Sequence, residues 1–137
     1  MRVYTPTETK IDEKVDMVIM RATTGDMGIL PGHIPYSAIL DYGVLRLVNK
    51  GAERRLAVFG GVAEVRDDIV TLLTREAHWP DEIDRDQAIA DREAAGSMLR
   101  EKKDAVEVQS SQALMRRSLV MIEVSSYPIL SNKDKAV

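Results

Sequence analysis

The strongest constraint on the fold is the way turn residues divide the segment before Trp79 into short apolar runs. The run VDMVIM, residues 15–20, alternates with the period of two that a half-buried strand requires. A β-hairpin is predicted by Asn49–Gly51, which separate VLRLV from RRLAVF. A second hairpin is predicted by Arg66–Asp68, which separate GGVAEV from IVTLL. Short strands at this spacing predict a β-sandwich or barrel over roughly residues 1–78.

The pattern changes at Trp79, where Pro80 ends the last expected strand. From here the apolar residues recur at helical spacing, and Pro128 ends regular structure before a tail that we expect to be frayed. The fold class predicted is therefore all-β plus α. It comprises an amino-terminal β-sandwich of short antiparallel strands, residues 1–80, and a carboxy-terminal antiparallel helical hairpin, residues 81–137.

Two helices are expected in the second domain. Asp84, followed three residues later by Gln87, resembles a capping box that begins a helix from about Asp84 to Lys103. A second helix is expected around Gln109–Val124, although its SLVMIEV run also suits a strand. The first helix carries small side chains on one stripe, which allow a close neighbour: Ala88, Ala94, Ala95, Met98 and Leu99.

Composition excludes several kinds of site. The sequence has no cysteine, which excludes disulfides and thiolate chemistry and predicts a reducing compartment. Its net charge is −3 and only 4% of its residues are aromatic, so we expect no nucleic-acid surface. No signal peptide is expected at the amino terminus. The longest uncharged run, Gly28–Leu40, is too short to span a bilayer, so any link to a membrane is expected to come through partners.

No motif for catalysis stands out. A triad of His33 with Ser37 and Asp41 is possible in principle, but we interpret a histidine between Gly32 and Pro35 as a loop or interface residue. Two acidic pairs lie in a turn and at a helix start, where carboxylates form local hydrogen bonds: Asp67–Asp68 and Asp84–Asp86. The sequence predicts a non-catalytic protein with no metal and no cofactor.

The segment GDMGILPGHIP, residues 25–35, holds three glycines and two prolines. This composition excludes a helix and predicts a punctuated loop rather than a long strand. Asp26 is expected at its tip, where it suits a polar contact. The apolar side chains of the loop either fold back over the sandwich or meet a partner.

Four stretches in a fixed order carry a resemblance to a known family: GDMGILPGHIPYSAIL, YGVLRLV, LAVFGGVAEVRDDIVTLLTREA and DEIDRDQAIADREAA. Over about residues 3–100 they resemble the epsilon subunit of bacterial and chloroplast-type ATP synthases. The resemblance implies a non-catalytic central-stalk subunit that joins the rotating gamma shaft to the membrane ring of c subunits. It also implies a location at the cytoplasmic face of the cell membrane, peripheral through the complex.

The resemblance assigns two sets of contacts in the first domain. Asp26, Met27 and Gly28 are expected to face the polar loops of the c ring. His33 and its neighbours Ile34 and Tyr36 are expected to lie against gamma. A loop fixed by proline and glycine on a stiff sandwich suits a joint that transmits torque.

The helical hairpin is the regulatory part of this family. When docked on the sandwich it leaves rotation free, and when extended along gamma toward alpha and beta it suppresses ATP hydrolysis. Residues 108–137 hold four Lys or Arg against two Asp or Glu. Arg116 and Arg117 are therefore expected to meet acidic residues of alpha or beta, although a solvated helix face explains the charge as well.

Some family members bind ATP in the docked hairpin through a motif of Ile or Leu, Asp, two free positions, Arg and Ala. Here IDRDQA keeps Ile83, Asp84 and Ala88 but has Gln87 in place of the arginine. In the second helix Arg116 matches one expected arginine and Val120 replaces another. Because two phosphate-binding cations are lost, we predict weak or absent ATP binding.

One alternative comes from another class of protein: a stand-alone sandwich that senses a nucleotide or another ligand. Binding of a gamma subunit discriminates between the two hypotheses, because a stand-alone sensor stays monomeric.

Overall fold

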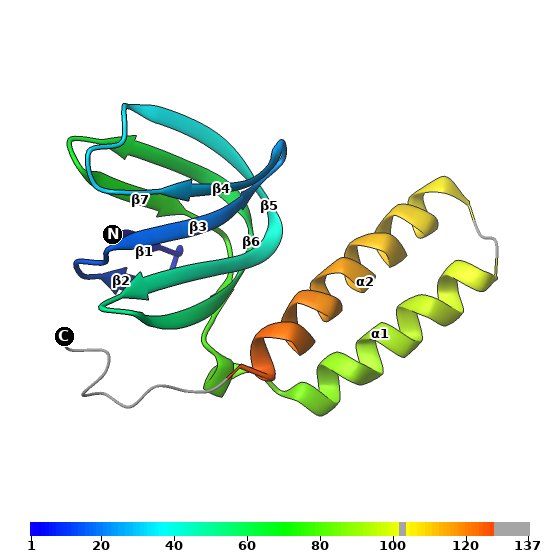
Figure 1. Ribbon diagram of the computed structural model, residues 1–137. Helices are drawn as coiled ribbons and strands as arrows, with labels where there is room; N and C mark the ends of the chain where they lie inside the picture. Colours follow the sequence, from blue (N-terminus) through cyan, green and yellow to red (C-terminus); the bar gives the residue numbers. More distant parts are fainter. Residues whose placement is uncertain (102–103, 128–137) are drawn as a thin grey trace.

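A computed structural model describes residues 1–101 and 104–127, in which all the strands precede the two helices (Figure 1). The elements are β1 (Arg2–Tyr4), β2 (Thr9–Asp12), β3 (Met17–Ala22), β4 (Gly25–Ile29), β5 (Tyr36–Asn49), β6 (Ala52–Arg66), β7 (Ile69–Leu73), β8 (Ala77–His78), a 3-10 helix η1 (Pro80–Glu82), α1 (Arg85–Arg100) and α2 (Ala105–Ser125). The predicted fold class is confirmed. The expected frayed tail after Pro128 lies outside the described residues.

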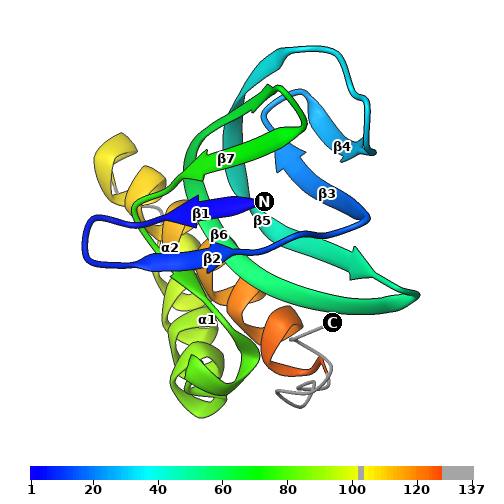
Figure 2. The same cartoon turned by 90° about the vertical axis from the view of Figure 1, so that its left-hand side faces the viewer.

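The strands form one hydrogen-bonded path in the order β2-β1-β7-β6-β5-β3-β4, and β8 also pairs with β6. All pairs are antiparallel except β1 with β7. The long strands β5 and β6 curve strongly, so that they belong to both layers of the sandwich (Figures 1 and 2). Both predicted hairpins are confirmed. The positive φ of Lys50 (51°) and of Asp67 (51°) matches the twist of tight hairpin turns.

The inward face of β6 changes at Gly60–Gly61. Before this point Leu56 and Val58 point into the core, whereas after it Ala63 and Val65 do so. The part of β5 that pairs with this bend makes the same change of inward face. Gly61 has φ +112° and lies so close to β7 that an added Cβ would meet the Leu73 carbonyl oxygen at 2.0 Å. The strand pair therefore presents a different set of side chains outward on either side of this bend.

The first helix begins where the sequence indicates, whereas α2 begins at Ala105, four residues before the expected Gln109. Asp84 caps α1 and accepts a hydrogen bond from the Gln87 backbone N–H (3.1 Å), but the Gln87 side chain bonds Asp91 (2.9 Å), so only half of the expected capping box forms. α1 ends at Arg100, before the expected end at Lys103, which itself lies outside the described residues. The SLVMIEV run is helical, so the strand alternative is wrong.

Small side chains join the two helices into a close hairpin. Ala88 and Ala95 of α1 are buried, as are Ser111 and Ser118 of α2. The two serine hydroxyls donate to carbonyl groups of their own helix, which satisfies them without a partner. Ala94 and Met98 are exposed instead of sharing the stripe, because the contact face follows a seven-residue spacing. The hairpin covers one side of the sandwich (Figure 2).

Candidate functional site

The loop after β4 is fixed by a turn and by a tether. Leu30–His33 form a β-turn in which the His33 N–H donates to the Leu30 carbonyl (3.2 Å), with Pro31 second and Gly32 third at φ +82°. The Gly32 N–H also donates to Asp68 Oδ1 in the β6–β7 turn (2.7 Å). Proline, glycine and a carboxylate therefore hold the shape of this loop.

Asp26, Met27 and Gly28 do not lie in a loop, as the sequence suggested, but in the edge strand β4. Five residue pairs with β3 hold this strand in register despite its glycines. The Asp26 carboxylate accepts two hydrogen bonds from the Arg21 guanidinium across the strands (2.9 and 3.3 Å), and this pairing lowers its pKa. Asp26 is thus an exposed, ionised group in a fixed position, whereas Met27 packs against the sandwich core.

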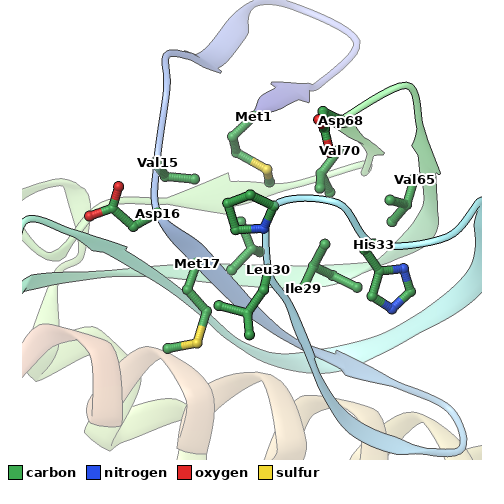
Figure 3. Close-up of a pocket in the computed structure, with 12 residues that line it drawn as sticks. Met1, Val15, Asp16, Met17, Ile29, Leu30, His33, Val65, Asp68 and Val70 are labelled. Atoms are coloured by element: carbon green, nitrogen blue, oxygen red, sulfur yellow. The ribbon is translucent and has the colours of Figure 1, made fainter.

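His33 borders a pocket of about 150 Å³ at the end of the sandwich, which the side chains of Met17, Leu30 and Val70 also line (Figure 3). Its ring lies edge-on to Tyr36 (6.3 Å between centroids), and Nδ1 lies 2.7 Å from the Ile34 carbonyl oxygen. Ile34 is 72% exposed. The structure therefore brings the three expected gamma-contact residues together, His33 and Ile34 on the loop and Tyr36 at the start of β5.

Next to this loop, the outer face of the sheet carries an open apolar row, which we define as Ile39, Val62 and Leu73. The three residues are direct neighbours on β5, β6 and β7, because Ile39 pairs with Val62 and Val62 with Leu73. They are 65%, 49% and 52% exposed, respectively. A contiguous exposed apolar row of this kind is typical of a protein interface.

On the other side of the Gly60–Gly61 bend, the helical hairpin covers the outer face. Here Ala57 and Phe59 form a buried cluster with Ala88, Met121 and Val124. Tyr42 lies edge-on to Phe59 (5.4 Å between ring centroids) and borders the cluster. The contacts to the sheet come from the carboxy-terminal half of α2, and the end of α1 and the start of α2 lie away from the sandwich (Figure 1).

Arg116 and Arg117, expected to reach alpha or beta, are both engaged with the sandwich. The Arg116 guanidinium donates to Asp41 (3.2 Å) and lies 5.0 Å from the centre of the Tyr42 ring. The Arg117 guanidinium makes two hydrogen bonds to the Glu76 carboxylate and lies 5.4 Å from the Phe59 ring. We call these two arginines and two carboxylates the latch.

Glu76 is the central acceptor of the latch. Burial alone would raise its pKa, but the hydrogen bonds from Arg117 and with His78 (2.7 Å) outweigh this effect, so the pKa lies below its ordinary value of 4.5. The carboxylate is therefore ionised at neutral pH and pairs with a charged guanidinium. Such a planar, charge-assisted pair is stronger than a hydrogen bond between neutral groups.

The end of α2 has a second attachment to the sandwich. The Tyr127 hydroxyl donates to Glu53 (2.7 Å), and the Arg55 guanidinium lies 4.3 Å from the Tyr127 ring. Arg85, in the first turn of α1, donates to the Ile122 carbonyl (3.3 Å) and to two serine hydroxyls at the end of α2. The base of the hairpin is thus tied both to the sheet and to itself.

The segment that connects the sandwich to the hairpin, Trp79–Ile83, is also held in place, and we call it the connector. Lys10 of β2 donates to Glu82 of η1 (2.7 Å), and Glu82 accepts from the Trp79 N–H (2.9 Å). The buried guanidinium of Arg54, paired with Glu13, lies 5.4 Å from the Trp79 ring. The connector therefore belongs to the sandwich up to Glu82, and Ile83 follows with extended backbone.

The residues of the expected nucleotide motif do not come together around a positively charged side chain that could bind phosphate. Ile83 and Ala88 pack in the apolar cluster, and Asp84 is used as the helix cap. Gln87 bonds within its own helix, and Arg116 is paired with Asp41. We keep weak or absent ATP binding as a prediction.

No metal-binding group of three or more His, Cys, Asp or Glu side chains occurs among residues 1–101 and 104–127. In the same part of the chain, none of the helices combines the length and the hydropathy needed to cross a bilayer.

The sequence reasoning missed the sheet side of the hairpin contact: Asp41, Tyr42, Phe59 and Glu76. A signal was present in Leu56–Phe59, four consecutive apolar residues that are all buried. Such a run predicts a strand covered on both faces, whereas alternation predicts one covered face. The polar partners Asp41 and Glu76 carried no comparable signal.

Comparison with known proteins agrees with this architecture. Residues 1–80 match the family described as ATP synthase, Delta/Epsilon chain, beta-sandwich domain. The chain is 35% identical over 125 residues to an ATP synthase epsilon chain from Bacillus velezensis (91% of this chain, 95% of the relative). It is 45% identical over 108 residues to an ATP synthase epsilon chain from Alkalihalophilus pseudofirmus (78% and 81%).

The fold is also similar to a chain in the cryo-EM structure of the Euglena gracilis mitochondrial ATP synthase, OSCP/F1/c-ring, with a TM-score of 0.79 and 24% identity (92% of this chain, 79% of that chain). A chain of the Tetrahymena thermophila mitochondrial ATP synthase central stalk and c ring gives a TM-score of 0.61 at 12% identity (90% and 93%). The chain belongs to the delta/epsilon family of ATP synthase subunits.

Proposed function

We propose that this chain is the epsilon subunit of a rotary ATP synthase, a non-catalytic part of the central stalk that couples the gamma shaft to the c ring. The supporting observation is the division of the sandwich surface into three fixed parts. One is the edge strand with Asp26, the second is the Pro31 loop with the open apolar row beside it, and the third is covered by the hairpin. A stiff block with two separate exposed contact surfaces suits a joint between two partners.

In this function, Asp26, Met27 and Gly28 face the polar loops of the c ring. His33, Ile34 and Tyr36 lie against gamma, and the open apolar row extends the gamma surface onto the sheet. The exposure of Ile34 and Ile39 (72% and 65%) supports an apolar partner. The chain then lies at the cytoplasmic face of the cell membrane and is held there by the complex.

The hairpin restrains ATP hydrolysis when it leaves the sandwich. In the extended state Arg116 and Arg117 contact acidic residues of alpha or beta. This is tested by the ATPase activity of the assembled complex before and after deletion of the chain from Asp84 onward. We expect the activity to rise on deletion, and unchanged activity would leave only the coupling role.

Binding to gamma is the direct test of the coupling role. We expect the full chain to co-elute with a gamma subunit, and the Ile39→Asp variant to lose this binding because it places a charge in the apolar row. Val106→Asp is the matched control, because Val106 is 73% exposed at the far end of the hairpin. A chain that stays monomeric beside gamma would favour the stand-alone sensor.

Titration with ATP by calorimetry tests the nucleotide prediction separately. Weak or no binding is expected because Gln87 and Val120 supply no cation. Micromolar affinity would contradict it.

A further inference from the structure

Polar contacts hold the docked hairpin at two places: Tyr127–Glu53 and Arg55–Glu123 at the end of α2, and Arg116 and Arg117 further up the same helix. Arg116 and Arg117 reach carboxylates on β5 and between β7 and β8, respectively. The apolar cluster beneath them is modest and contains two alanines among its five buried members. The polar contacts therefore carry a large share of the specificity of docking.

We propose that the Arg117–Glu76 pair is the release point of the hairpin, with Arg116–Asp41 as its weaker companion. The inference rests on the proposed regulatory role and deepens it. The arginines that would serve an acidic partner in the extended state are occupied by Glu76 and Asp41 in the docked state. Docking and partner binding therefore compete for the same two guanidinium groups.

The two pairs differ in strength for a structural reason. Arg117 and Glu76 each expose 34% of their side chains, and two guanidinium nitrogens contact the carboxylate. Arg116 exposes 56% of its side chain and makes one hydrogen bond, to Asp41. A solvated single contact contributes little, whereas a part-buried contact through two nitrogens contributes more.

The connector determines where the motion begins. Because Lys10 binds Glu82 and Arg54 lies over Trp79, the chain stays attached to the sandwich through η1. The first residues without such a clamp on the sandwich are Ile83 and Asp84, and Ile83 has extended backbone (φ −97°, ψ 126°). Release of the latch, followed by loss of the Tyr127–Glu53 contact, therefore lets the hairpin pivot at Ile83–Asp84 while the connector remains in place.

The test uses the full chain alone, so that it is independent of gamma and of ATPase activity. The chain has no cysteine, so nitroxide labels at T24C on the β3–β4 turn and S110C on α2 are specific. Electron-electron double resonance then gives the distance between sandwich and hairpin. For the chain with an intact latch we expect one dominant docked distance.

The isosteric variant E76Q and the variant R117M should each raise the ratio of undocked to docked hairpin about tenfold. The double variant E76Q/R117M should equal either single variant, because both remove the same interaction. E64Q is the matched control: Glu64 is also a sheet carboxylate paired with an arginine, Arg66, but on the open half. Its distance distribution should match that of the unmodified latch.

Unchanged distances in both E76Q and R117M would overturn the proposal, as would an equal effect of E64Q. Additive effects in the double variant would show that the two residues act separately and would also overturn it. These outcomes are distinguishable from failure of the proposed function, which is judged by gamma binding and by the ATPase activity of the complex.

Discussion

The interior of the sandwich and the surface under the helical hairpin are both apolar, yet they are built differently. The interior consists of large aliphatic side chains from seven strands, and Val3, Leu56 and Leu72 are completely buried. The contact between the sheet and the hairpin has two aromatic rings, Tyr42 and Phe59, one alanine from each side and a border of ion pairs. The first arrangement favours a block that stays closed, and the second favours a contact that opens at modest cost.

The largest expected effect separates the two regions directly. Leu72→Ala should lower the free energy of unfolding of the sandwich by about 3 kcal/mol, because it leaves a cavity in the closed core. Denaturant unfolding followed by the fluorescence of Trp79, the only tryptophan, measures it. Leu73→Ala, at the exposed neighbouring position, should change the stability by less than about 0.5 kcal/mol. Equal losses would remove the distinction between core and surface.

Gly61→Ala should have the next largest effect on the sandwich, about 2 kcal/mol, because the new methyl group would lie 2.0 Å from the Leu73 carbonyl oxygen at a positive φ. The same unfolding measurement applies. Gly28→Ala on β4 is the control, since an added Cβ there has no heavy atom within 4 Å outside its chain neighbours. If both variants were equally stable, the close approach of β6 and β7 would not matter.

Met121→Ala should act on docking rather than on the sandwich. Met121 is 7% exposed and packs from α2 against Ala57 and Phe59 of the sheet, so its loss should cost about 2 kcal/mol of docking free energy. Hydrogen exchange should speed up in α2, whereas the midpoint of sandwich unfolding stays unchanged. Leu119→Ala, at a 47% exposed position of the same helix, should leave the exchange unaltered. A lower unfolding midpoint in Met121→Ala would mean that the two regions unfold together.

The smallest expected effect is a dependence of the docked fraction on pH in the acidic range. Since the pKa of Glu76 is lowered in the docked state, its stabilisation is complete above the ordinary value of 4.5 and is lost as the pH falls through the lowered value. The docked fraction, measured by the label distance, should fall in this acidic range. E76Q should show a flatter curve, and the difference isolates Glu76 from Glu53 and Glu82, whose pKa values are lowered as well. Identical curves would contradict the latch.

Local chemistry made much of the fold predictable. The two hairpin turns fall within the predicted segments, at Lys50–Gly51 and at Asp67–Asp68, and Asp84 caps the first helix. The SLVMIEV run was ambiguous because α2 is covered on two sides: Ser118 faces α1 while Met121 and Val124 face the sheet. A helix buried on two faces loses the clear apolar stripe that identifies it.

Contacts between distant residues were not predictable. Arg117 and Glu76 are 41 residues apart, and Arg116 and Asp41 are 75 apart, so no local pattern links them. β4 was missed for a similar reason: its glycines suggest a loop, and its strand conformation comes from pairing with β3. The sequence therefore singled out Arg116 and Arg117 but not the carboxylates with which they pair.

The change of face at Gly60–Gly61 has a mechanical consequence. Ile39 and Val62 of the open apolar row lie on the same two strands, β5 and β6, as the surface under α2, and Ile39 and Tyr42 are three residues apart on β5. A load applied by a partner at the row is thus carried through covalent backbone and ladder hydrogen bonds directly beneath the hairpin. In the proposed function, the surface that binds gamma and the surface that seats the hairpin therefore share β5 and β6.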